Sequence, residues 1–306
     1  MRVYEGGAPP YRPTSDPTVY LRTGNVTTPL RQADADIVGY LYAKRAEAEA
    51  VQAQNLKRAQ ARLDAVVARQ AAEAAQQGEA TLPPAKTQEL TIQNLRLLTA
   101  YLQPFYPRDE LAQPWRIESK LADLRLPDGA SHYFPERQLQ PVADGLLWAQ
   151  ATTQYRLFAC HQVYADGLVH AAENTDMPGQ ERGQDLHLDQ IARLLYLVLR
   201  FSGRLYASLG YSGLVRGGVR LANTQGRRVQ RIVIPTNRAF YFPADMPVTI
   251  DREYHWLLEA DTHQLTDGDW LHDYFKQRMR RIYWDLGYSD VRDEVLEYVV
   301  RGLSAS

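Results

Sequence analysis

The feature that most constrains this chain is a long, proline-free segment from Asp34 to Gly78 that is rich in alanine, glutamine and arginine. Alanine has the highest helix propensity of the residues, and within the segment Gly39 is the one weak point for a helix. A continuous helix here would be roughly 65 Å long at about 1.5 Å per residue, longer than a small domain is wide. We therefore predict a single long helix that serves as a spacer or as an assembly surface.

One face of this predicted helix carries a thin apolar stripe. Leu56, Ala59, Leu63 and Val66 recur at alternating steps of three and four residues, which keeps them on one side of a helix. Only two heptads are in phase, so two alternatives stay open. In the first, these four residues form a coiled-coil or oligomer interface; in the second, they pack onto the chain's own C-terminal domain.

The N-terminal residues 1–33 predict an extended β arm. They are rich in glycine and proline, and residues 18–22 alternate apolar and polar side chains as a short strand does. Gly24-Asn25 suits a turn that needs positive φ. A single strand is not stable alone, so we expect it to pair with the C-terminal domain or with another chain.

A family resemblance covers residues 8–45. The residues that carry it are Pro9-Pro10-Tyr11, the run Val19-Tyr20-Leu21-Arg22-Thr23-Gly24, Thr27-Thr28-Pro29, and the start of the helix from Ile37 to Arg45. This stretch resembles the end of a Schlafen-type AlbA_2 domain, in which a strand of the pattern aromatic, apolar, Arg, any residue, Gly precedes a helix with basic residues. The C-terminal portion, after about residue 190, resembles more loosely the region on the C-terminal side of such domains in some bacterial proteins.

The resemblance implies a nucleic-acid-binding or ATP-binding ancestry. Some members of the family are nucleases, and some are tied to defence against mobile DNA. The family's acidic and basic functional residues would lie before Met1, so no catalytic residue is carried over. Arg22 alone is transferred by position, as a residue placed to contact a nucleic-acid backbone.

The rest of the chain predicts an α+β domain behind a hinge. Residues 79–89, with Pro83-Pro84, form the hinge, and residues 90–306 form a C-terminal domain of mixed helices and antiparallel sheet. Residues 143–166 fit one or two strands or a buried helix. The other expected elements, in chain order, are a helix over 90–102, an exposed loop over 167–189, a helix over 191–210, a strand over 214–221 with a bulge at its glycine pair, a hairpin strand over 227–234, a strand over 247–260, and helices over 269–286 and 291–303.

Composition narrows the class of protein. Thirty-five basic and 36 acidic side chains give a formal net charge of -1, which offers no whole-chain argument for nucleic acid or membrane. The single cysteine, Cys160, excludes an internal disulfide and a cysteine-based zinc site, and its apolar neighbours predict a buried structural thiol. Neither a signal peptide nor an apolar run of about 18 residues occurs. We expect a soluble cytoplasmic protein without a cofactor.

Two clusters are candidates for chemistry. Arginines on the predicted helix and hairpin could track phosphates in a salt-dependent way; they are Arg204, Arg216, Arg220, Arg227, Arg228, Arg231 and Arg238. The second group could supply metal ligands, although its spacing matches no tight signature; it is His161, His170, Glu173, Asp185, His187 and Asp189. The alternative for both groups is that they are ordinary polar residues on the protein surface, and we predict no metal site.

The sequence therefore predicts a non-enzymatic interaction or assembly protein. Its partner is a second copy of the chain or a larger protein, and the family resemblance places it in a bacterial defence complex. Two alternatives stay open. The first is a nucleic-acid-binding module that uses Arg22, Arg216, Arg220, Arg227, Arg228 and Arg231. The second is a metal-dependent nuclease built on His161, His170 and Glu173.

Overall fold

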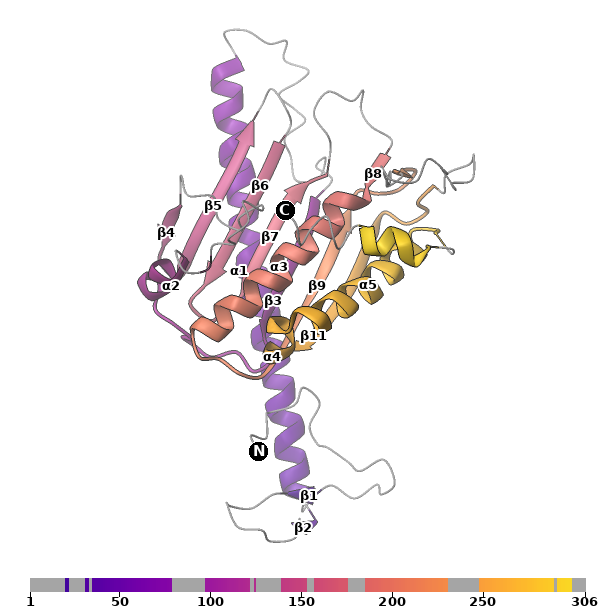
Figure 1. The fold of residues 1–306 in the computed structure, drawn as a ribbon. Helices are drawn as coiled ribbons and strands as arrows, with labels where there is room; N and C mark the ends of the chain where they lie inside the picture. Colours follow the sequence, from indigo (N-terminus) through magenta and orange to yellow (C-terminus); the bar gives the residue numbers. More distant parts are fainter. Residues whose placement is uncertain are drawn as a thin grey trace.

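The computed structural model of the 306-residue chain describes residues 20–21, 31–32, 35–78, 97–121, 124, 139–152, 157–175, 185–230, 248–288 and 291–298. Its body is a seven-stranded antiparallel sheet with helices on both faces (Figure 1), which confirms the predicted α+β class. In spatial order the strands are β11 (Glu253–Asp261), β9 (Leu214–Ala222), β3 (Leu97–Pro104), β7 (Val169–Asn174), β6 (Leu157–Tyr164), β5 (Gly145–Thr152) and β4 (Gln140–Val142).

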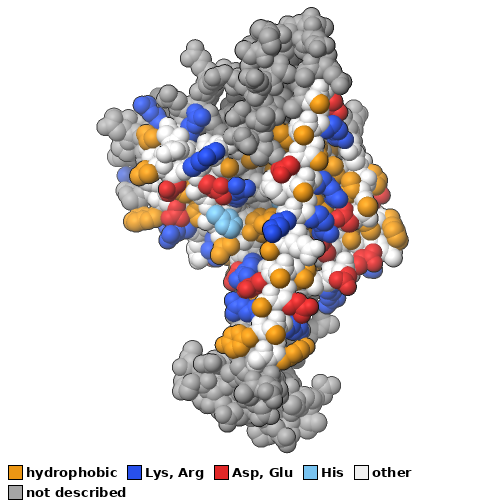
Figure 2. Space-filling view, turned by 180° about the vertical axis from the view of Figure 1, so that it is seen from behind, with side chains coloured by type: hydrophobic (Ala, Val, Ile, Leu, Met, Phe, Trp, Pro, Cys, Tyr) orange, Lys and Arg blue, Asp and Glu red, His pale blue; other side chains and the backbone are white. Residues whose placement is uncertain are grey.

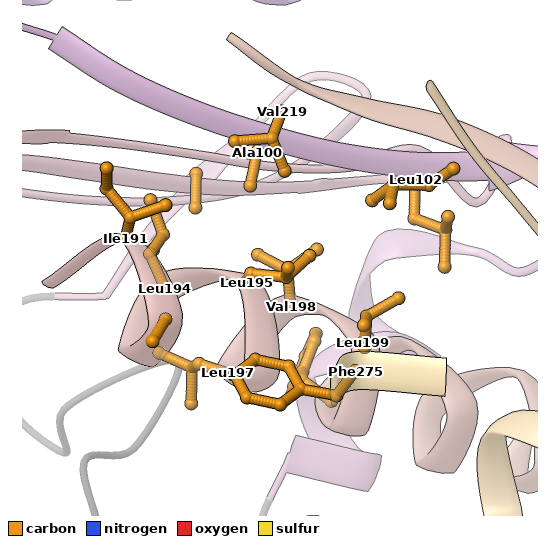
Figure 3. Close-up of a cluster of buried hydrophobic side chains, with 14 of the residues drawn as sticks. Ala100, Leu102, Ile191, Leu194, Leu195, Leu197, Val198, Leu199, Val219 and Phe275 are labelled. Carbon is orange, nitrogen blue, oxygen red and sulfur yellow. The ribbon is translucent and has the colours of Figure 1, made fainter. Parts of the chain in front are cut away.

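One face of the sheet, here called the α3 face, holds the main core. Helix α3 (Leu188–Ser208) lies across it, and its apolar stripe packs against side chains of β3 and β9 (Figure 3). The predicted helix is thereby confirmed, and Gly210 follows its end with a φ of +70°. The other helices on this face are α2 (Pro114–Leu121), α4 (Thr262–Thr266) and α5 (Gly268–Asp285).

The opposite face, here called the α1 face, carries the long helix. Helix α1 (Ala35–Gly78) confirms the predicted 34–78 helix almost to the residue. It crosses behind the sheet and continues past the sheet's lower edge (Figures 1 and 2). Because both faces are covered along the middle strands, those strands are buried on both sides.

Strand β3 replaces a predicted helix. Residues 97–104 form a central strand, whereas the sequence predicted a helix over residues 90–102. All eight positions of β3 are buried, because α3 covers one face and α1 the other. A strand buried on both faces reads as a continuous apolar run without alternation, and such a run cannot be told from a buried helix by periodicity.

Strand β7 lies where an exposed loop was predicted. Residues 169–174 pair with both β3 and β6 in the middle of the sheet, so the prediction of an exposed loop over 167–189 is wrong there. Two polar residues of this strand, His170 and Glu173, have hydrogen-bond partners inside the fold. For residues 143–166 the sequence left one strand, two strands or a buried helix open. The structure has two paired strands there, β5 and β6.

The glycine pair of β9 forms no bulge. Gly217 and Gly218 pair in unbroken register with β3 on one side and β11 on the other. A Cβ on Gly217 would lie 1.9 Å from the backbone oxygen of Tyr101, and one on Gly218 would lie 2.7 Å from Nε2 of His255. Glycine is therefore required at position 217, where the near atom belongs to the backbone, and a pattern of single residues cannot distinguish this from a bulge.

The predicted arginine hairpin is also wrong. Strand β10 (Arg228–Gln230) pairs in parallel with β8 (Asp185–His187), and the partner of β9 is β11 instead. The predicted strand over 247–260 is thus confirmed in part, and α5 confirms the helix predicted over 269–286. Residues 293–298 are helical, as predicted for the last segment.

The N-terminal strand finds a local partner. Strand β1 (Tyr20–Leu21) pairs with β2 (Arg31–Gln32), and not with the main sheet as one expectation had it. The predicted hinge over residues 79–89 lies outside the described residues.

Candidate interaction surfaces

Helix α1 has two parts with different surroundings. We call residues 48–67 the docked segment and residues 35–47 the arm. Ala59 and Leu63 of the docked segment are fully buried. Tyr40 and Tyr42 of the arm are 65% and 50% exposed. The docked segment therefore fixes the direction of a helix whose residues 39–47 continue past the sheet with most of their side chains exposed (Figure 2).

Apolar contacts attach the docked segment to the chain's own sheet. Leu63, Val66 and Val67 pack in one cluster with side chains of β3, β5, β6 and β7. Ala59 and Leu56 pack in a second cluster with Tyr101 and Tyr164.

These contacts overturn the predicted oligomer interface. Leu56, Ala59, Leu63 and Val66 face the chain's own sheet, so they are not offered to a second chain. The other alternative, packing onto the C-terminal domain, is the observed one. The stripe correctly identified which side of the helix is buried, but a hydrophobic stripe carries no information about which chain supplies the partner surface.

Three glutamines bridge the docked segment and the sheet. The side-chain amide of Gln52 donates to the backbone oxygen of Phe105 at 2.5 Å, and that of Gln103 donates back to the oxygen of Gln52 at 3.4 Å. Gln162 donates to the oxygen of Ala59 at 3.3 Å. Sequence reasoning missed these residues, although a glutamine inside an otherwise apolar strand was a signal that a polar partner lies opposite.

Ion pairs flank the docked segment on both sides. Toward β5 and β6, Arg62 lies 2.7 Å and Arg58 3.2 Å from the carboxylate of Asp144, and Arg58 also binds Asp166. Toward β9, Glu49 lies 3.2 Å from Arg216. Hydrogen bonding by Arg216 lowers the pKa of Glu49. Together with the glutamines, these pairs set the position of α1 along the sheet.

The predicted nucleic-acid surface does not assemble as expected. Arg216 and Arg220 lie on the open part of the α1 face, and each is paired with a glutamate of β11, Arg216 with Glu259 at 2.8 Å and Arg220 with Glu253 at 2.6 Å. Figure 2 shows the resulting mixture of acidic and basic side chains beside α1. Arginines neutralised in this way make a poor phosphate track.

The remaining arginines of that prediction are elsewhere. Arg228 lies on β10 and Arg227 directly before it, in the small two-stranded sheet with β8. Arg22 and Arg231 lie outside the described residues.

The histidines proposed as metal ligands are divided between the two faces of the sheet. On the α3 face, Nε2 of His161 lies 3.0 Å from Glu173, which also binds Arg193 of α3. On the α1 face, Nδ1 of His170 lies 3.2 Å from the amide of Gln162. His170 and Glu173 lie on a strand, where positions three apart point to opposite faces.

Within the described residues, no group of three His, Cys, Asp or Glu side chains could hold a metal ion. Asp185, His187 and Asp189 lie on β8 and at the start of α3, and their side chains fall outside the described set. The three-residue metal group of the nuclease alternative is therefore not brought together.

Burial controls the protonation of several of these groups. It lowers the pKa of His170 to about 4, with a smaller contribution from His161, and Nε2 of His170 has no hydrogen-bond partner among the residues that the structure describes. Burial by itself would raise the pKa of Glu173, but its bonds to His161 and Arg193 outweigh that effect and leave the pKa lowered. Cys160 is fully buried with a pKa raised to about 12, as the predicted structural thiol requires.

Comparison with known proteins gives no relative. No family model matches the chain, and no curated protein or solved structure matches it significantly. The resemblance of residues 8–45 to Schlafen-type AlbA_2 domains therefore stays a prediction. None of the helices in the described ranges combines the length and apolar character that a membrane span needs.

Proposed function

We propose that this protein is a non-enzymatic assembly protein that associates with a second copy of itself through the arm of α1. The observation that carries the proposal is the division of α1 into a docked segment and an exposed arm. A helix that is anchored over residues 48–67 holds the arm in a fixed direction, so binding through the arm costs little ordering entropy.

The side chains of the arm suit contact with another helix. Tyr40 and Tyr42 are large aromatic residues, a class enriched in protein interfaces. Gly39, Ala43 and Ala46 are exposed and small, and small side chains at a contact allow two helices to approach closely. The arm contains 13 residues, which gives it a length of roughly 20 Å at about 1.5 Å per residue.

Replacing both arm tyrosines tests this proposal. We expect the Tyr40→Ala/Tyr42→Ala variant to show a lower molar mass than the wild type in light scattering, because its aromatic contacts are lost. Trp115→Ala is the matched control, since Trp115 is 66% exposed but lies on α2. A double variant with the same mass as the wild type at every concentration would contradict the role of the arm.

The other two functional interpretations have less support. Nucleic-acid binding through the arginines is disfavoured by the ion pairs of Arg216 and Arg220, and the nuclease alternative by the separation of His161 and His170. We also propose that the protein belongs to a bacterial defence complex, and the Schlafen-type resemblance of residues 8–45 is the support for this part.

A further inference from the structure

Strand β11 forms one edge of the main sheet. It has nine residues, three times as many as β4 at the opposite edge, and among the described residues its strand partner is β9. An edge strand of this length presents a row of backbone donors and acceptors that can pair with another strand.

Two side chains show which backbone groups point away from β9. The N–H of Glu259 donates to the hydroxyl of Tyr274 at 3.2 Å, and the N–H of Asp261 donates to Oε1 of Gln264 at 3.0 Å. Alternate residues of a strand direct their N–H groups to the same side. The N–H groups of Glu253, His255 and Leu257 therefore also point to the open edge, and within the described part of the chain they have no partner there.

Exposed apolar side chains accompany this open stretch. Leu257 is 58% exposed on the α1 face of β11, and Val248 and Ile250, just before the strand, are 49% and 82% exposed. Trp284 of α5 is 58% exposed, and the next residue, Asp285, accepts a 2.8 Å hydrogen bond from Trp256 of β11. The edge is thus open in its backbone, and exposed apolar side chains stand beside it among charged ones such as Arg252 and Glu253, a mixture found at many protein contact sites.

We infer that two copies of the chain pair antiparallel through β11, about a two-fold axis that passes beside His255. In this register, Glu253 of each copy lies opposite Leu257 of the other, and the two His255 residues lie opposite each other. It is the register that uses all three open N–H groups of both copies and leaves the bonds to Tyr274 and Gln264 in place. Opposed residues that exchange hydrogen bonds in this way lie about 5.5 Å apart at Cα.

A second copy fits this edge better than an unrelated peptide. The open window from Glu253 to Leu257 is symmetric about His255, as a two-fold pairing requires. The charge of Glu253 does not oppose this pairing, because it is already bound by an arginine. Nε and Nη2 of Arg220 donate to the two carboxylate oxygens of Glu253 at 2.6 and 2.9 Å, and these hydrogen bonds lower the pKa of Glu253. Leu257 of the partner copy would therefore face a neutralised ion pair and not a free charge. This inference does not depend on the arm.

Proline at position 257 is the direct test. Because the N–H of Leu257 points away from β9, Leu257→Pro leaves the chain's own ladder intact while it removes one bond per copy and blocks the open edge. Leu257→Val keeps the N–H and is the control. All measurements use the Tyr40→Ala/Tyr42→Ala background, so that any arm contact is already removed, and sedimentation equilibrium gives the dimer dissociation constant.

We expect Leu257→Pro to weaken the dimer at least tenfold and Leu257→Val to change it less than threefold. His255 provides a second test that does not depend on tolerance of proline. His255→Lys and His255→Glu should each weaken the dimer at least tenfold, because like charges then oppose each other, and an equal mixture of the two variants should restore affinity to near the starting value.

Three results would overturn the inference. They are a protein that is monomeric in this background at all concentrations, a dimer that Leu257→Pro leaves unchanged, or a mixture of the two His255 variants that associates no better than either alone. An edge that binds an extended peptide of another protein while the chain stays monomeric would likewise refute self-pairing. None of these results would bear on the arm, which is tested by the tyrosine variant.

Discussion

Replacing Leu63 with alanine is expected to lower the free energy of unfolding by about 2–5 kcal/mol, the range for truncating a fully buried leucine. Leu63 is fully buried between α1 and the sheet, in the cluster that includes Val66 and Phe158. Its loss should weaken the docking of α1 as well as global stability. Limited proteolysis within residues 35–78 reports the first effect, and chemical denaturation measures the second.

Val51→Ala is the matched control for Leu63→Ala. Val51 lies on the same helix, on the N-terminal side of the residues that pack in the two apolar clusters, and its side chain is 37% exposed. Surface substitutions of this kind change stability by about 0.5 kcal/mol or less. Equal effects of the two substitutions would mean that α1 is not held to the sheet by its buried stripe.

Acidification is expected to destabilise the fold through His170. The pKa of His170 is about 4 in the folded chain, while an exposed histidine titrates near 6.5. The unfolded chain therefore binds a proton that the folded chain excludes, so the contribution of His170 is complete above pH 6.5 and is lost as the pH falls toward 4. The expected loss at pH 4 is about 3 kcal/mol.

A glutamine at this position isolates the effect. His170→Gln cannot take up a proton, so the wild type should lose about 3 kcal/mol more than the variant between pH 7 and pH 4 in parallel denaturant titrations. The comparison is needed because Glu173, whose pKa is lowered, also loses stabilisation as the pH falls. Parallel pH profiles of the two proteins would show that His170 is not buried in its neutral form.

The elements that the sequence predicted well are those with one buried side. Helix α3 has a wide apolar stripe and a glycine beyond its end, and α1 has a thin stripe on an alanine-rich background. In both, the helical period is visible because the opposite side is polar. Strand β3 lacks this contrast, since α3 and α1 cover its two faces, and its apolar run was assigned to a helix.

The candidate surfaces were predictable only in part. The apolar stripe at Leu63 and Val66 was found, but its partner, the chain's own sheet, depends on contacts with strands that lie 30 to 109 residues further along the chain. The pairing of Arg216 with Glu259 and of Arg220 with Glu253 likewise depends on the register of β9 with β11. The alignment of these two strands depends on the whole sheet and cannot be seen in the local sequence. Counting the arginines in this segment therefore overestimated the positive charge available to bind phosphates.

The open edge of β11 was beyond sequence reasoning for a related reason. A strand over residues 247–260 was predicted, but its place at the edge depends on the order of all seven strands. The bond from the N–H of Glu259 to Tyr274, which reveals the direction of the edge groups, joins a strand to a helix and leaves no local signal.

The central claim is that α1 is anchored over residues 48–67 and mostly exposed over residues 39–47. Hydrogen exchange along α1 tests this directly, because amides exchange at rates set by the free energy of local opening. We predict slow exchange over residues 52–67, comparable with that of α3, and much faster exchange over residues 39–47 in protein kept dilute enough to be monomeric. Equal exchange rates in the two segments, or rapid exchange throughout α1 beside a protected α3, would contradict the claim.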